Sequence, residues 1–171
     1  MQISSRPFDL SQASFSESID PLLQKIYQSR GLSCDAELNL QLTQLPVPDD
    51  LKSIGTAVEH LIIALHQQQR ILIVGDFDAD GATSSALMVL ALTAMGYQHV
   101  DFLVPNRFHY GYGLTPEIVE LSRSQKPDLI ITVDNGISSL EGAALAKRLG
   151  IKVVITDHHL PGTQLPDVAA I

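Results

Sequence analysis

Cysteine, tryptophan and long apolar runs are scarce or absent in this sequence of 171 residues. The single cysteine, Cys34, excludes an internal disulfide framework and a zinc site built from several cysteines. No apolar run reaches the roughly 18 residues that cross a bilayer. The amino terminus also lacks the basic and then apolar segments of a secretory signal. We therefore expect a protein of the reducing cytoplasm.

Basic residues are also few, with 11 Lys and Arg against 19 Asp and Glu, and the formal net charge is -8. This balance argues against nonspecific binding of duplex DNA through an overall positive field. It does not exclude an enzyme acting on nucleic acid, because a pair of bound divalent ions would offset about four negative charges. With 45% hydrophobic residues, the length suits one compact α/β domain.

Short apolar runs rich in β-branched residues predict buried strands. They span residues 71–74, 100–104, 129–133 and 151–155, and a fifth begins at 168–171. Helical patterns lie between them at 82–95, 115–125 and 138–149, and the first of these is apolar nearly all round, so we expect it to be well buried. Alternating strands and helices predict a doubly wound parallel sheet. We expect the strand order 2-1-3-4-5, which places the first and third strands side by side where the order reverses.

Residues 1–48 predict a helical amino-terminal extension. Asp20 and Pro21 supply a cap and a proline at the first helical position, and Gly31 ends that helix. A second short helix is expected over 33–42 and a long amphipathic helix over 50–69. We therefore place the α/β domain at 49–171.

Three aspartates at alternate positions, Asp76, Asp78 and Asp80, follow the first strand, and Gly81 then turns the chain into a helix. Carboxylates this close repel one another unless a cation lies among them. Oxygen ligands at this density suit a hard divalent ion such as Mg²⁺ or Mn²⁺. The pattern therefore predicts a metal site at the end of the first strand.

Other interpretations of the acidic segment fit the sequence less well. The calcium loop of an EF-hand needs a preceding helix and a glutamate at its twelfth position, whereas a strand precedes this segment and Leu87 holds that position. A phosphatase with an aspartyl nucleophile needs a partner lysine and a late acidic pair, and that pair is not evident. A set of solvated loop acids with a helix cap is the remaining alternative.

Further polar clusters follow the third and fourth strands. Asp134 comes directly after the third strand, and Asp157, His158 and His159 follow the fourth. The carboxyl ends of parallel strands share one edge of the sheet, so these clusters are expected to line one crevice with the first. One histidine can then bind a metal ion while its neighbour faces a substrate, and Asp157 can hold one ring in the tautomer that binds the metal. The alternatives are an ordinary Asp-Asn-Gly turn and a surface turn with two histidines.

The loop at 105–114 is long, aromatic and rich in glycine. Arg107 in such a loop can contact phosphate, and its aromatic side chains can stack on bases. A lid that packs on its own aromatic side chains is an equal alternative. The candidate substrate-binding residues are Ser84, Asn106, Arg107, Tyr112 and His159.

Three motifs occur in order: Gly-Asp-Phe-Asp-Ala-Asp-Gly-Ala-Thr-Ser at 75–84, Val-Asp-Asn-Gly at 133–136 and Thr-Asp-His-His-Leu-Pro-Gly at 156–162. Together they resemble the DHH phosphoesterase superfamily. The segments at 104–108, 111–114 and 134–139 narrow the resemblance to its single-stranded-DNA-specific exonucleases. The resemblance is dense from about residue 51 to residue 171.

This resemblance implies a hydrolase dependent on Mn²⁺ or Mg²⁺ that degrades single-stranded DNA from the 5′ end to mononucleotides. It also implies a role in recombination and mismatch repair, with helicases and single-strand-binding protein as partners. Two metal ions can activate an attacking water and stabilise the charge that develops on phosphate. Binding through the DNA backbone and stacked bases implies little sequence preference.

The family's functional residues map onto this sequence by position. The resemblance implies that Asp78 binds one metal ion and Asp80 the other, with Asp76 near the first. Asp134 would bridge the two ions and His158 would be a further ligand. His159 would contact the scissile phosphate. The expected catalytic residues are Asp78, Asp80, Asp134, His158 and His159.

One departure from the family concerns the end of the sequence. Related proteins carry a further motif with another aspartate ligand and then a second domain that closes the groove, and this sequence ends before both. We interpret it as an amino-terminal fragment whose catalytic domain is truncated at its carboxyl end. Two alternatives remain. One is a DHH phosphoesterase acting on oligonucleotides, cyclic dinucleotides or pyrophosphate, and the other is a non-catalytic DHH scaffold.

Overall fold

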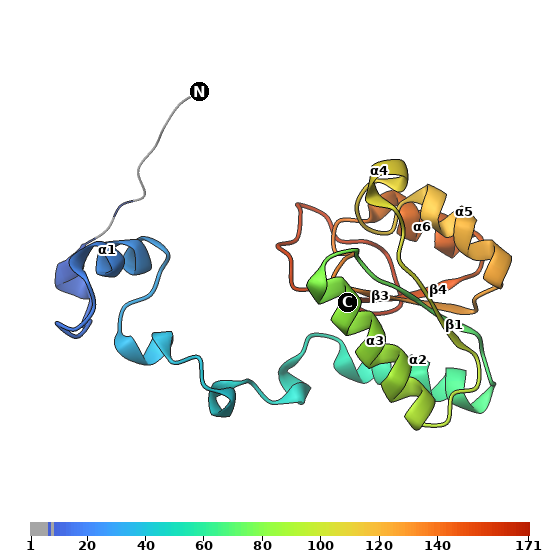
Figure 1. Ribbon diagram of the computed structural model, residues 1–171, viewed down its shortest axis with the longest axis horizontal. Coiled ribbons are helices and arrows are strands. Elements are labelled where there is room, and N and C mark those ends of the chain that lie inside the picture. Colours follow the sequence, from blue (N-terminus) through green and yellow to red (C-terminus); the bar gives the residue numbers. More distant parts are fainter. Residues whose placement is uncertain (1–6, 8) are drawn as a thin grey trace. The chain divides into compact units, whose positions relative to one another are not determined.

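The computed structural model describes residue 7 and residues 9–171 (Figure 1). The chain divides into two compact units, Met1–Val47 and Pro48–Ile171. Within the described part of the chain, no helix is long and apolar enough to cross a membrane.

The first unit contains short helical elements around one α-helix. The elements are η1 (Leu10–Gln12), α1 (Pro21–Ser29), η2 (Asp35–Leu38) and η3 (Leu42–Gln44). Asp20 caps α1, because its side chain accepts a hydrogen bond from the backbone N–H of Leu22 at 2.8 Å. The continuous helix predicted over 33–42 is wrong. Asn39 has an extended backbone and its side chain accepts from Gln41 N–H, which favours a turn over a further helical bond.

The second unit contains a four-stranded parallel sheet. Its strands are β1 (Ile71–Val74), β2 (Val100–Leu103), β3 (Leu129–Val133) and β4 (Lys152–Thr156). Their order is β2-β1-β3-β4, which confirms the predicted doubly wound order over these strands. Val74 at the end of β1 is in register with Leu103 and Thr132 on its two neighbours. The acidic segment therefore leaves the sheet between the ends of β2 and β3.

The predicted fifth strand is reduced to one parallel bridge between Ala170 and Val154. Two backbone hydrogen bonds accompany this bridge, from Ile155 N–H to Ala170 at 3.0 Å and from Ala169 N–H to Val153 at 2.9 Å. The contact lies beside β4, on the side where the predicted order places a fifth strand.

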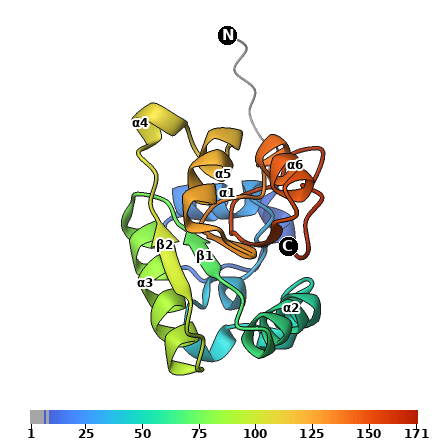
Figure 2. The same cartoon turned by 90° about the vertical axis from the view of Figure 1, so that its right-hand side faces the viewer.

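Helices cover both faces of the sheet (Figures 1 and 2). On one face, α2 (Ile54–His66) and α3 (Ala79–Ala94) pack over Ile71 and Ile73 of β1. On the other, α5 (Pro116–Ser122) and α6 (Leu140–Arg148) pack over Leu72 and Val74. The smaller elements are η4 (Pro48–Asp50), α4 (Arg107–Tyr110) and η5 (Arg123–Gln125). Alternate residues of the central strand thus enter two separate cores, as a strand buried on both faces requires.

The expectation that the helix after the acidic segment is well buried is wrong. In α3 only Gly81, Ser85 and Leu92 are buried, while Leu87 and Leu90 are 70% and 69% exposed. The helix packs near β2, which is the edge strand of the sheet, so only one stripe of its surface meets the core. Its start also differs from the prediction, since α3 begins at Ala79 inside the acidic segment.

Candidate metal centre

The turn between β1 and α3 depends on two glycines. A Cβ atom at Gly81 would lie 2.4 Å from the carbonyl oxygen of Asp76, and one at Gly75 would lie 2.1 Å from Ser85 Oγ. Both distances are far below van der Waals contact, so a side chain at Gly81 would displace the backbone of Asp76, and one at Gly75 would displace the side chain of Ser85. The glycines therefore let the first turn of α3 pack against Asp76, which is 8% exposed.

Asp78 combines a structural role with its predicted role as a metal ligand. It is the N-cap of α3, and its Oδ1 atom accepts a hydrogen bond from Gly81 N–H at 3.0 Å. This bond holds the pKa of Asp78 below its usual value. Asp78 is therefore a carboxylate held in place by the helix that it starts.

Asp134 lies at the end of β3 in an unusual backbone conformation. Its φ angle is +63°, a left-handed region that is unfavourable for residues other than glycine. The carboxylate is nearly buried, and burial raises the pKa of Asp134. His158 Nε2 lies 2.9 Å from Asp134 Oδ1. Strain and burial at one acid are typical of a functional site.

Two groups of potential metal ligands share Asp134. Asp76, Asp78 and Asp134 can each offer a ligand atom within 4.8 Å of the others, and so can Asp134, His158 and His159. Carboxylate and imidazole donors suit Mn²⁺ and related divalent ions. The donor set therefore fits a pair of ions that share one carboxylate.

Asp80 is placed differently from the other acids. Among the described residues it belongs to neither group of ligand atoms. It lines the same open pocket of about 410 Å³ as Ser84, Asp134 and His158. The predicted role of Asp80 as a metal ligand therefore stays a prediction.

His159 is oriented by the buried side chain of Asp157. Its Nδ1 atom lies 2.7 Å from Asp157 Oδ1, and this hydrogen bond raises the pKa of His159. Burial raises the pKa of Asp157, but hydrogen bonds from the backbone N–H groups of Ile137 and His159 outweigh it, so the net shift is downward. Because Nδ1 is engaged, Nε2 is the ring nitrogen of His159 left to face a substrate.

The loop before α5 reaches the same edge of the sheet. Arg107 forms an ion pair with Asp76, and its guanidinium carbon lies 4.2 Å from the ring centre of Phe77 and 5.0 Å from that of Tyr112. The Tyr112 hydroxyl donates to the backbone oxygen of Asp134 at 3.2 Å and lies 3.1 Å from His159 Nδ1. Burial, followed by nearby carboxylates, raises the pKa of Tyr112 to about 12. The structure thus brings Arg107, Tyr112 and His159 together.

The other two predicted substrate-binding residues form local hydrogen bonds. Asn106 caps α4 by accepting from Phe108 N–H at 2.9 Å. Ser84 Oγ donates to the backbone oxygen of Asp80 at 2.6 Å. Their contacts with a substrate stay predictions.

Sequence reasoning missed Phe77 and Asn135. Phe77 stacks on Arg107, and the sequence signal was its position between two acids. Asn135 is 1% exposed, and its side chain bonds to the backbone of two strands. The Asp-Asn-Gly segment is typical of a turn, so the sequence gives no sign that the Asn135 side chain bonds to two strands.

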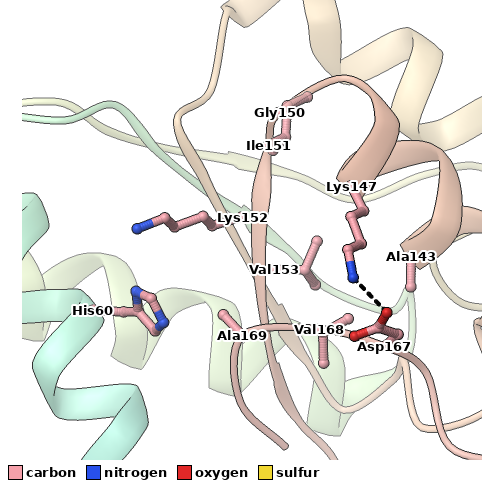
Figure 3. Close-up of a pocket in the computed structure, with 10 residues that line it drawn as sticks. All are labelled: His60, Ala143, Lys147, Gly150, Ile151, Lys152, Val153, Asp167, Val168 and Ala169. Atoms are coloured by element: carbon pink, nitrogen blue, oxygen red, sulfur yellow. Dashed lines mark hydrogen bonds and ion pairs between the residues drawn. The ribbon is translucent and has the colours of Figure 1, made fainter.

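Another pocket, of about 320 Å³, opens at the amino-terminal end of β4 (Figure 3). It is lined mainly by apolar atoms, with Lys147, Lys152 and His60 at its margin. The acid among its lining residues, Asp167, is paired with Lys147 at 2.5 Å. This pocket lacks the group of carboxylates that a divalent metal ion needs, and it lies at the edge of the sheet opposite the acids.

The chain is similar to known proteins in both sequence and structure. Residues 70–171 match the DHH family, N-terminal domain. The single-stranded-DNA-specific exonuclease RecJ of Salmonella typhimurium is 51% identical over 153 residues, which cover 90% of this chain and 26% of that protein. The Escherichia coli protein of the same name is 49% identical with the same coverage. The chain thus spans about a quarter of the length of these relatives.

A solved structure of exonuclease RecJ bound to manganese is similar to this chain, with a TM-score of 0.65 and 38% identity. The match covers 77% of this chain and 32% of that one.

Proposed function

Because this chain belongs to the DHH family, we propose that residues 49–171 are the catalytic domain of a metal-dependent exonuclease that degrades single-stranded DNA from 5′ to 3′. The observation that carries the proposal is the shared position of Asp134 in two groups of ligand atoms. The names of the most similar relatives, and the manganese in a related structure, support the same substrate and cofactor.

The residues of the candidate centre have different proposed roles in phosphodiester hydrolysis. Asp76, Asp78 and Asp134 would hold one Mn²⁺ or Mg²⁺ ion. Asp134 and His158, with Asp80, would hold a second. Activation of water and neutralisation of phosphate charge are what such a pair of ions supplies when bound. The negative net charge of the chain makes these ions the main source of positive charge at the reacting phosphate.

His159 contributes a hydrogen-bond donor to the scissile phosphate. Asp157 holds the ring by Nδ1 and favours its protonated form, so Nε2 can donate to a phosphate oxygen. Arg107 is close enough to Asp76 to pair with it and can instead bind a DNA phosphate. Tyr112, Ser84 and Asn106 complete the proposed DNA-binding surface. Contacts to phosphates and base faces carry little sequence information.

The same proposal assigns partners and a location. An enzyme restricted to single strands needs strands that are already separated, so a helicase and single-strand-binding protein are its expected partners in recombination and mismatch repair. The single cysteine is in keeping with action in the cytoplasm.

Digestion of end-labelled DNA tests the proposal. Single strands labelled at the 5′ or the 3′ end are incubated with the protein while Mn²⁺ is titrated. We expect metal-dependent release of mononucleotides from the 5′ label first, loss of release with a chelator, and no digestion of blunt duplex. Hydrolysis of pyrophosphate or a cyclic dinucleotide without digestion of DNA would contradict the proposed substrate, and no metal-dependent hydrolysis would contradict the catalytic role.

Variants identify the residues responsible. Asp80→Asn and His158→Ala should abolish release while the melting temperature stays within a few degrees of the unaltered protein. Glu59→Gln, at an exposed acid of α2, is the matched control and should leave activity unchanged. Full activity in Asp80→Asn would refute the role given to Asp80.

A further inference from the structure

Asn135 joins the ends of the two strands that carry the metal-binding acids. Its side-chain Nδ2 donates to the backbone oxygen of Val74 at 3.0 Å and to that of Val133 at 2.9 Å. Val74 is the last residue of β1 and Val133 the last of β3. One buried amide therefore bonds to both strands at the level where they end.

The backbone itself separates at this level. The last register pair between these strands is Val74 with Thr132. Beyond it, Gly75 N–H donates to Leu103 of β2 at 3.1 Å, and Asp134 N–H donates to Thr156 of β4 at 3.0 Å. The two segments that carry the acids thus bond outward, in opposite directions, and the amide of Asn135 spans the gap between them.

The geometry of Asp134 needs such support. A left-handed backbone is uncommon for aspartate and persists where the surroundings impose it. Carboxylate oxygens of Asp134 and Asp78 also lie within 4.8 Å of each other, so the two charges repel. The bond from Asn135 to Val133 fixes the residue before Asp134, and the bond to Val74 fixes the strand that leads to Asp76 and Asp78.

We infer that Asn135 is a positioning residue that sets the spacing between the carboxylate of Asp134 and those of Asp76 and Asp78, and thereby the affinity for the metal ions. This inference rests on the proposed function. A side chain that only stabilised the fold would contribute to the free energy of unfolding and leave metal binding in the folded protein unchanged. Residues that orient metal ligands typically change metal affinity by about 10- to 100-fold when replaced.

The test compares Asn135→Ala with the unaltered protein and with Ser122→Ala. Ser122 is fully buried in α5 and its hydroxyl donates to Val119 at 2.7 Å, so its loss also removes a buried side-chain bond. Mn²⁺ binding is measured by calorimetry, the magnetic coupling between bound Mn²⁺ ions by electron paramagnetic resonance, and the free energy of unfolding with urea.

We expect Asn135→Ala to bind Mn²⁺ about 10-fold more weakly and to show an altered magnetic coupling. Ser122→Ala should lose stability while retaining both properties. Should Asn135→Ala not fold, Asn135→Ser, which keeps a donor on a shorter side chain, is measured in its place with the same expectation. Mn²⁺ affinity and coupling equal to those of the unaltered protein would overturn the inference and leave the proposed function standing. Absence of Mn²⁺ binding by the unaltered protein would overturn both.

Discussion

At the scale of single residues, Asp134 combines several features that lower the stability of the fold in the absence of a metal ion. The residue has a left-handed backbone, a nearly buried carboxylate and a raised pKa. The charged form of this carboxylate is unfavourable without a cation, because burial and the neighbouring Asp78 both oppose it. The arrangement is therefore one that a bound divalent ion stabilises.

Asp134→Asn should separate these effects. Asparagine tolerates the left-handed region and carries no charge, so the metal-free variant should unfold at the same temperature as the unaltered protein or higher. The proposed nuclease activity should fall more than about 100-fold, since Asp134 is the proposed ligand shared by both ions. Asp134→Ala is the matched comparison and should be about 1 kcal/mol less stable than Asp134→Asn. Calorimetric melting in chelator measures the stability of each variant, and the digestion assay measures its activity. A large loss of stability in Asp134→Asn would contradict this account.

Tyr112→Phe tests the hydroxyl that connects the loop to Asp134 and His159. The ring remains, so KM for DNA should change little. The rate constant kcat should fall about 5- to 10-fold, because about 1 kcal/mol of hydrogen bonding is lost. Tyr112→Ala should also raise KM, since base stacking contributes about 1 to 3 kcal/mol. Steady-state kinetics on short oligonucleotides separates the effects on kcat and KM. A change confined to KM in Tyr112→Phe would show that the hydroxyl only binds DNA.

Most residues of the candidate metal centre could be predicted from the sequence, but the contacts between them could not. Acids and histidines at strand ends predicted a metal site from their positions alone. Distances were needed to show that the ring Asp157 orients is that of His159, that Asp80 belongs to neither ligand group, and that Asn135 spans two strands. The bond from Asn135 to Val74 joins residues 61 positions apart, and the other two features depend on side-chain rotamers, so sequence spacing does not encode them.

At the scale of elements, α3 and the metal centre share a side chain. Asp78 is both the cap of α3 and a member of one ligand group. The first turn of the helix therefore cannot shift without moving a carboxylate of the centre. This sharing also explains why the helix begins at Ala79, three residues before its predicted start at 82.

Asp78→Asn and Asp78→Ala should distinguish the two roles. Asparagine caps helices about as well as aspartate, so Asp78→Asn should keep its stability in chelator and lose Mn²⁺ binding. Asp78→Ala should lose the same binding and about 1 kcal/mol of stability as well. Urea unfolding in chelator and Mn²⁺ calorimetry provide the comparison. Equal stability of the two variants would mean that the cap contributes nothing.

Tyr97 connects α2 to the segment between α3 and β2, since its hydroxyl donates to Leu61 at 2.8 Å. Tyr97→Phe should cost about 1 kcal/mol of stability at neutral pH. Burial raises the pKa of Tyr97, so its stabilising contribution is present below the unfolded-state pKa and is lost as pH rises through the folded-state value. Urea unfolding of both proteins from pH 7 to 11 should show the difference shrinking above about pH 10. A constant difference would contradict a buried, neutral hydroxyl.

Elements were predictable where burial is uniform. The central strands β1 and β3 match their predicted ranges residue for residue, because both faces are covered and every position except Thr132 is apolar. The prediction failed for α3, whose apolar surface is largely exposed. An apolar surface all round a helix does not show how much of that surface other elements cover. For α3 the covered part is small because the helix packs near the edge of the sheet.

At the scale of the whole molecule, the chain consists of two units joined by an exposed segment. Residues 39–50 are all exposed, and Leu40 and Leu42 are 94% and 84% exposed. Limited digestion with thermolysin, which cuts before large apolar residues, should first cleave within 39–47 and leave a resistant product beginning near Pro48. Sequencing of the product's amino terminus identifies the cut. Early cleavage within 71–133 would contradict an independent second unit.

The register of β1 is set outside the hydrophobic cores. Ile71, Leu72, Ile73 and Val74 are all aliphatic, so a shift by one position would refill both cores with similar side chains. It would also carry Asp76 about 3.3 Å along the sheet relative to Asp134 and break the amide bond to Val74. The polar contacts at the end of β1 thus fix the register of a strand whose own side chains are similar in size and polarity. The register that pairs β1 correctly therefore also brings the acids of the candidate metal centre to their places.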